Sequence, residues 1–303
     1  MQSVKITEDA VLRCLEGAID MHVHSYPDLI DRSGNDIEFA LSAKKFKMGG
    51  FVIKSHYAPT TDRAILVNSI VTGTKVYGAL SLNNAVGGIN PLAVEVSGRL
   101  GARVIWFPTV DSRNEADKRN LPEIAHPPPW AKLQKELVNE GFPMPPVDLF
   151  NGNGDFTREV IDVIKLIKKY RMTLATGHIS PRESIKLIKV AHEEGVDKIV
   201  VTHPEFPSTN FSIQEQQDLC KFDVYFERCY SMPATSKTTW DFIEREIRAT
   251  GIEHNIISTD LGQKKSILPI DGMKESARIL MEKNFREDMV RTMMVDNTQY
   301  LVG

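Results

Sequence analysis

The stretch Gly17-Ala-Ile-Asp-Met-His-Val-His24 is a short apolar run that ends in two histidines. Because successive side chains of a β-strand point to opposite faces, we expect His22 and His24 on the same face, about 6–7 Å apart. Two imidazoles at this spacing can bind one metal ion. Three later apolar runs also end in a nitrogen or oxygen donor, at His178, His203 and Asp260. These donors at the ends of predicted strands indicate a catalytic metal centre.

Segments with the composition of β-strands recur along the chain and alternate with helical patterns. The predicted strands lie near residues 17–24, 50–56, 75–82, 102–108, 171–178, 198–203, 222–227 and 254–260. Helices are predicted near 36–47, 63–70, 90–101, 156–170, 180–195, 212–220, 237–250, 271–283 and 286–294. One of them begins with the capping box Ser180-Pro-Arg-Glu183, in which proline takes the first helical position.

This alternation predicts an α/β fold of parallel strands joined by right-handed crossovers. Eight such units close into a (β/α)8 TIM barrel, and we interpret residues 1–303 as one such domain. An open doubly wound sheet is the alternative. It usually has fewer strands and a glycine-rich phosphate loop after the first strand, which this sequence lacks.

A proline-rich segment interrupts the alternation after the fourth predicted strand. It covers about residues 111–150 and contains one predicted helix, near 130–139. Loops after barrel strands lie on the catalytic face. The segment therefore either covers the active site or is a plain surface excursion, and the sequence leaves both interpretations open.

Composition excludes several classes of protein. A net charge of −3 argues against a nucleic-acid partner, and no apolar run reaches the length of a membrane span. Cys14, Cys220 and Cys229 form no CxxC pair, and the first residues lack the layout of a signal peptide. We therefore expect reduced thiols and a cytoplasmic protein without nucleic-acid or membrane partners.

The spacing of the donors agrees with the barrel. One unit takes roughly 31 residues. His178 and His203 are 25 positions apart, about one unit, and His203 and Asp260 are 57 positions apart, about two. The 154 positions between His24 and His178 correspond to four units plus the insertion. The donors thus fall on strands one, five, six and eight, at the ends where barrel active sites form.

His-x-His on strand one, histidines on strands five and six and an aspartate on strand eight together resemble the amidohydrolase superfamily of metal-dependent hydrolases, here in an uncharacterised branch. The resemblance implies that His22, His24 and Asp260 hold a divalent metal, usually zinc. It implies that His178 and His203 hold a second ion in binuclear members, and in mononuclear ones contact the first ion or the substrate. Asp260 would also take the proton as a metal-bound hydroxide attacks an amide, ester, lactone or phosphoester bond.

The chain departs from this pattern on strand four. Many binuclear members carry a carboxylated lysine or a glutamate there, but Val104–Asp111 contains neither, and Asp111 lies beyond the strand end. Strand two instead carries Lys54 among apolar residues, where a lysine is costly unless paired or modified. Lys54 could bridge two metals as a carbamate, bind an anionic part of the substrate as an ammonium group, or extend to solvent at the barrel rim.

Further candidates lie on neighbouring strands. His56 shares a face with Lys54, and Asn83 follows strand three, so both are candidate substrate-binding residues. Asp20 shares the face of His22 by the period of two and could either orient a histidine or simply form a hydrogen bond inside the barrel. One residue of the pair Glu227 and Arg228 should face the mouth of the barrel.

Two other functions remain open from the sequence. The missing bridge on strand four favours one metal, as in the mononuclear zinc decarboxylases and lyases related to this superfamily. A barrel that binds a ligand without turnover is the second alternative. In either enzyme reading we expect a small-molecule substrate, and homo-oligomers are frequent among such enzymes.

Overall fold

The computed structural model describes residues 6–118 and 128–303. Short parallel strands form two sheets, in the orders β1-β2-β3 and β4-β5-β6-β7-β8-β9. Their bounds are β1 Ile19–Val23, β2 Gly50–Ile53, β3 Lys75–Tyr77, β4 Ala79–Ser81, β5 Val104–Trp106, β6 Thr173–Ala175, β7 Ile199–Val201, β8 Val224–Cys229 and β9 Asn255–Ser258. Every predicted strand is therefore present, and the predicted run 75–82 is divided into β3 and β4.

The division at Gly78 is caused by Thr60, which lies 19 positions from Ala79. Thr60 N donates a hydrogen bond to the Ala79 oxygen at 3.0 Å, and Ala79 N donates to Thr60 Oγ1 at 2.8 Å. Thr60 thus takes the place that a neighbouring strand would occupy. A Cβ on Gly78 would lie 2.5 Å from the Thr61 Cα, so only glycine allows this close approach.

The two sheets also meet at their other edges. Asp260 N donates to the His22 oxygen at 2.8 Å, and His24 N donates to the Leu261 oxygen at 2.8 Å. A parallel bridge joins Val23 and Leu261. The strand order therefore returns to β1 after β9, as the predicted TIM barrel requires.

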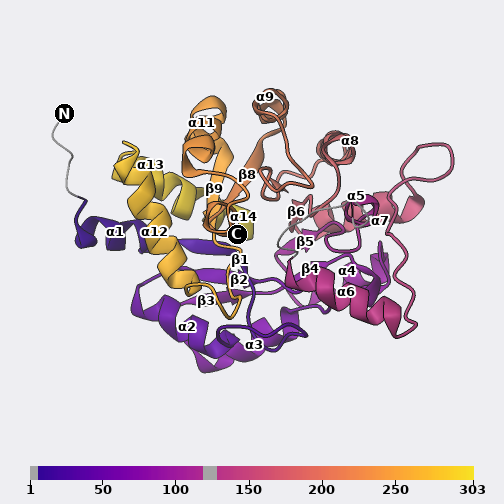
Figure 1. Ribbon diagram of the computed structural model, residues 1–303, viewed down its shortest axis with the longest axis horizontal. Helices are drawn as coiled ribbons and strands as arrows, with labels where there is room; N and C mark the ends of the chain where they lie inside the picture. The colour runs from indigo at the N-terminus through magenta and orange to yellow at the C-terminus, as the bar shows by residue number, and fades with distance from the viewer. Residues whose placement is uncertain (1–5, 119–127) are drawn as a thin grey trace.

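Helices surround the central strands, as Figure 1 shows. Their bounds are α1 Glu8–Leu15, α2 Asp36–Lys45, α3 Thr61–Ile70, α4 Pro91–Arg99, α5 Arg113–Lys118, α6 Pro129–Asn139, α7 Arg158–Lys169, α8 Pro181–Glu193, α9 Ile213–Leu219, α10 Ser231–Ala234, α11 Trp240–Thr250, α12 Pro269–Glu282, α13 Glu287–Arg291 and α14 Asn297–Val302. Short 3₁₀ turns are η1 Asn84–Val86, η2 Cys220–Phe222 and η3 Ile252–His254, and η4 Thr292–Asp296 is a π-helix. The capping box predicted at Ser180 is confirmed.

The hydrophobic side chains separate into an inner and an outer set. Residues such as Met21, Val52 and Trp106 fill the barrel between the strands. Leu301 of α14 belongs to the same inner cluster, and its main-chain oxygen accepts a hydrogen bond from Thr173 Oγ1 at 2.7 Å. Larger clusters pack the helices against the outside of the strands. Because α14 closes the end where the strands begin, the site must lie at the opposite end.

A bulge in β1 overturns the predicted position of Asp20. The pairing register of β1 with β2 shifts between Asp20 and Val23. Both residues line the same cavity between the barrel and its outer helices, although strict alternation would place them on opposite faces. Asp20 therefore lies on the outer side of β1, away from the face of His22. There it accepts a hydrogen bond from Thr259 N at 3.0 Å and ties β1 to the end of β9.

The insertion contains one more helix than predicted, and hydrogen bonds from both helices connect it to the barrel. Besides α6 it contains α5, which carries no regular apolar period and was not expected. Asn114 Nδ2 on α5 donates to the main-chain oxygens of His178 and Ser208, at 2.9 and 2.8 Å. From α6, Gln134 Nε2 donates to Asp111 Oδ1 at 2.6 Å. Residues 119–127 of the predicted insertion lie outside the described residues.

None of the helices between residues 6 and 118 or between 128 and 303 has the length and apolar character needed to cross a bilayer.

Candidate metal centre

Two histidines at β1 and a carboxylate after β9 converge at the carboxyl end of the barrel. His22 Nε2 lies 3.1 Å and His24 Nε2 lies 3.2 Å from the same oxygen, Asp260 Oδ1. The second oxygen, Asp260 Oδ2, accepts a hydrogen bond from Ser231 Oγ at 2.8 Å. Both histidines are buried, and the Asp260 side chain is 17% exposed. One carboxylate oxygen is thereby held toward both imidazoles.

The backbone after β9 is shaped for this approach. Asp260 has a φ of 49°, a left-handed conformation that aspartate tolerates better than most residues. Gly262 follows with a φ of 126°, and a Cβ there would lie 1.6 Å from the His24 oxygen. Glycine is therefore required where this segment passes β1. The contact brings the carboxylate of Asp260 beside the histidines.

Lys54 points into the site, not to the rim. Its Nζ lies 2.9 Å from His22 Nε2 and 5.1 Å from the centre of the Trp106 ring. The side chain is buried, and burial lowers the pKa of its ammonium group although Asp260 and Glu227 oppose that change. Trp106 Nε1 is itself buried without a hydrogen-bond partner among the described residues. Trp106 Nε1 is therefore a donor beside Lys54 that a further acceptor group would satisfy.

Glu227 of β8 orients the first histidine. Its Oε2 lies 3.1 Å from His22 Nδ1, and both side chains are fully buried. Cys229 Sγ lies on the same side, 3.9 Å from His22 Nδ1. With Nδ1 directed at a carboxylate, the ring presents Nε2 to Asp260. Of the predicted pair, Glu227 thus faces the site, whereas Arg228 lies among Glu205, Glu246 and Gln216.

The remaining predicted histidines complete one cluster. The ring centres of His178 and His203 are 5.0 Å apart, and those of His22 and His203 are 6.0 Å apart. His178 Nδ1 lies 3.2 Å from Glu115 Oε1 of α5. The Nδ1 of His203 is buried and has no hydrogen-bond partner within the described ranges. The sequence thus brought the right histidines together but missed Glu115, because no pattern around it connects the insertion to strand five.

His56 and Asn83 lie on the same side of the cluster. The His56 ring centre is 5.1 Å from that of His24, and its Nδ1 lies 2.9 Å from Thr109 Oγ1. Asn83 Nδ2 donates to the His56 oxygen and to Thr109 Oγ1, and its Oδ1 accepts from Thr109 N. The Asn83 amide therefore supports the His56 loop. Contact of either residue with a substrate stays a prediction.

Burial and neighbouring charges shift the titration of the cluster. Burial sets the pKa values of His24, His56 and His203 well below the usual histidine value. Burial and Lys54 act in the same direction on His22, but Asp260 and Glu227 outweigh them and raise its pKa. Burial opposes ionisation of Asp260, yet His22 and His24 hold its pKa well below the usual carboxyl value. The low pKa values favour neutral imidazoles at His24, His56 and His203, the form that binds a metal, whereas a cation would have to displace a proton from His22.

The donor set fits a divalent cation. Ligand atoms of His22, His24 and Asp260 all lie within 4.8 Å of one another, which places them around one shared point. Imidazole nitrogens and a carboxylate oxygen are the ligands of catalytic zinc and similar ions. The carboxylate behind His22 and the unpartnered Nδ1 of His203 agree with such a centre.

Comparisons with known proteins place the fold. The sequence profile of a family of unknown function (DUF6282) matches residues 17–227. No curated protein matches the sequence. An amidohydrolase from Pseudomonas aeruginosa is similar in structure, with a TM-score of 0.63, 10% identity and 98% of each chain covered. An organophosphorus hydrolase from Deinococcus radiodurans gives a TM-score of 0.57 and 13% identity, with 96% of this chain and 94% of that chain covered.

A structure titled putative 2-pyrone-4,6-dicarboxylic acid hydrolase from Pseudomonas putida is also similar. Its TM-score is 0.56 at 13% identity, and the match covers 95% of this chain and 97% of that chain. At such low identities the likeness shows the fold alone. The chain has the TIM-barrel fold of amidohydrolase-type and organophosphorus hydrolase-type proteins, as the sequence predicted.

Proposed function

We propose that this chain, which belongs to the DUF6282 family, is a metal-dependent hydrolase of an amide, ester, lactone or phosphoester bond in a small molecule. One observation carries the proposal. The Nε2 atoms of His22 and His24 both lie within 3.2 Å of one oxygen of Asp260 at the carboxyl end of the barrel. The structural relatives named as hydrolases support it through their shared fold.

In this proposal His22, His24 and Asp260 hold the ion, for which zinc suits the ligands best. A bound divalent cation acts as a Lewis acid that lowers the pKa of water and polarises the scissile bond. Asp260 would hold the ion through Oδ1 and would accept the proton released during attack; Ser231 Oγ donates to its other oxygen and fixes the orientation of the carboxylate. His178 and His203 hold a second ion or contact the substrate.

Lys54 could have either of two roles, which differ in the charge of its side chain. As an ammonium group it would stabilise negative charge beside His22, which lies 2.9 Å away. As a carbamate it would supply the carboxylate that strand four lacks, and the Trp106 N–H, which has no partner in the part of the chain that the structure describes, could donate to it. The lowered pKa favours the neutral amine that carbamate formation requires. Mass spectrometry of the intact protein in bicarbonate distinguishes the two, since the carbamate adds about 44 Da to the chain.

The test combines metal analysis with activity. The purified protein is loaded with zinc or manganese, its metal content is measured, and generic esters, lactones and phosphotriesters are assayed. We expect bound metal and turnover in the wild type, and loss of both in His22→Ala. His192→Ala is the matched control, because His192 is exposed on α8. Turnover that persists after complete metal removal would refute the proposal.

A one-metal lyase or decarboxylase is the second candidate. It is favoured by Trp106, which stands at the end of β5 where many binuclear relatives are expected to carry the bridging residue. One ion per chain together with loss of carbon dioxide from an aromatic acid would support this candidate. Two ions per chain with turnover of the hydrolase panel would support the binuclear hydrolase. Metal binding without turnover of any tested compound would favour a ligand-binding barrel.

A further inference from the structure

Lys237 is a basic residue above the histidine cluster to which the proposed chemistry assigns no role. It lies in the segment between α10 and α11, and its Nζ is 5.6 Å from the centre of the Phe206 ring. The same ring lies 5.1 Å from the His203 ring and 5.4 Å from the His178 ring. Lys237 is therefore separated from the candidate ligands by a single aromatic side chain.

No carboxylate of the described residues forms an ion pair with Lys237. Its ammonium group donates one side-chain hydrogen bond, to Thr235 Oγ1 at 2.8 Å. Burial lowers its pKa, and Asp260 opposes this shift through its negative charge. In contrast, Lys264 after β9 is solvated and lies 3.2 Å from Asp31. A partly desolvated cation without a counter-ion is stabilised when an anion binds beside it.

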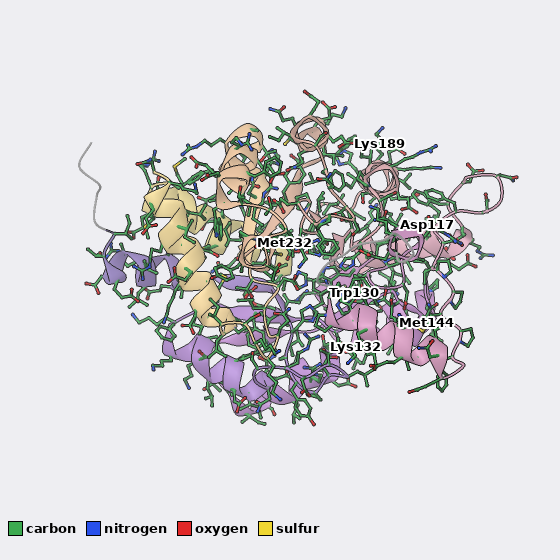
Figure 2. The ribbon with its side chains drawn as sticks, viewed as in Figure 1. Asp117, Trp130, Lys132, Met144, Lys189 and Met232 are labelled. Atoms are coloured by element: carbon green, nitrogen blue, oxygen red, sulfur yellow. The ribbon has the colours of Figure 1, made fainter. Side chains whose placement is uncertain are left out.

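The surroundings of Lys237 are apolar and aromatic. Phe206, Met232 and Cys229 form one buried cluster below it. The Trp130 ring of α6 also lies near the cluster, 6.1 Å from the His178 imidazole. Figure 2 labels Trp130 and Met232 near the middle of the view. Aromatic walls of this kind bury the planar part of a ligand, and a single cation fixes its polar end.

We propose that Lys237 binds the carboxylate of a small aromatic or unsaturated organic acid whose planar part lies beside Phe206 and Trp130. That this acid is the substrate rests on the proposed function, whereas the anion site itself does not. The assignment separates this chain from a hydrolase of neutral esters, because a neutral ligand would leave the ammonium group of Lys237 unpaired. Asp260 does not supply the missing partner once it holds a cation.

The test is a calorimetric titration with benzoate and with its neutral analogue benzamide. Both are titrated into the full chain, once after chelation and once after loading with zinc. The variants are Lys237→Met, which removes the charge at similar length, and Lys237→Arg, which keeps it. Lys264→Met is the matched control for loss of one lysine on a neighbouring loop. Thermal melts verify that each variant is folded.

We expect wild-type protein and Lys264→Met to bind benzoate more tightly than benzamide. Lys237→Met should raise the Kd for benzoate about tenfold or more and leave that for benzamide unchanged. Lys237→Arg should retain most of the benzoate affinity. Equal affinities for the two compounds, no binding of benzoate, or unchanged benzoate binding by Lys237→Met would overturn the proposal. Because the chelated protein is titrated without turnover, a failed hydrolase assay refutes the proposed function and leaves this result intact.

Discussion

Replacement of Glu227 by glutamine tests how the barrel prepares His22 for a metal. The carboxylate lies 3.1 Å from His22 Nδ1, on the opposite side of the ring from Asp260. A carboxylate at Nδ1 keeps the proton there and leaves the lone pair of Nε2 free for a cation. Glutamine has nearly the same shape but carries no charge. It can also present its NH₂ group to the ring, which favours the wrong tautomer.

The expected effect follows from the position of Glu227 behind a ligand. Loss of such a partner typically weakens metal binding by about 10–100-fold, or about 1.4–2.7 kcal/mol. Both side chains are fully buried, so water cannot replace the lost hydrogen bond. We therefore expect at least a tenfold increase in the Kd for zinc. The free energy of unfolding of the metal-free variant should lie within about 1–3 kcal/mol of that of the metal-free wild type.

The assay is a competition titration of zinc against a chelating dye, with ion stoichiometry measured in parallel. Glu115→Gln is the informative comparison, because Glu115 lies 3.2 Å from His178 Nδ1. If His178 binds a second ion, Glu115→Gln should lower the affinity for that second ion only. Glu227→Gln should lower the affinity for the first ion. Glu16→Gln controls for loss of an exposed carboxylate on the same chain.

Unchanged zinc affinity in a folded Glu227→Gln protein would refute the role of Glu227. An equal loss in Glu16→Gln would show that the effect is one of net charge. Circular dichroism and thermal melts establish that both variants are folded before the titrations are compared.

Three further outcomes are expected. Asp260→Asn should lower kcat/KM on a confirmed substrate about 10²–10⁴-fold while the melting temperature of the metal-free protein changes little, and full turnover would show that Asp260 is not the base. Chelation should lower the melting temperature, since an ion at 1,000 times its Kd adds about 4 kcal/mol; calorimetry that detects no shift contradicts a tightly bound ion. Burial raises the pKa of Glu246 to about 8 although Arg228 opposes the shift, so its contribution to stability is complete below pH 4.5 and is lost as pH rises through 8. Urea unfolding should therefore show stability falling between pH 5 and 8 by on the order of 1–3 kcal/mol from Glu246. Burial also raises the pKa of Asp20 to about 7, so Glu246→Gln should reduce the slope, and the part between pH 7 and 8 should disappear first.

Much of the barrel was predictable because its signals are local. The period of two placed His22 and His24 together, and their Nε2 atoms do approach the same oxygen. Strand composition located every strand, and spacing placed the other donors at strand ends. Capping chemistry predicted the start of α8 at Ser180. Apart from the spacing of the donors, which uses the roughly constant length of a barrel unit, each of these inferences depends on residues within a few positions of one another.

Other features depend on contacts between segments far apart in sequence. The bulge in β1 turns Asp20 to the outer side, where it bonds to Thr259, 239 positions away. Likewise, Thr60 divides the third strand by bonding to Ala79. Neither interruption leaves a mark on local hydrophobic periodicity, because the residues involved are compatible with regular strands. Strict alternation therefore failed at these points.

The sequence by itself determined which residue types stand at the ends of the strands, since the alternation of side chains and the spacing of units are properties of the local chain. Only the tertiary structure decided which side chains from other segments contact these strand-end residues. Glu115 reaches His178 from the insertion, and Lys237 reaches Phe206 from another loop. Loop sequences have no periodicity from which contacts between side chains of different loops could be predicted. Only closure of the barrel brings these side chains within a few ångströms of each other.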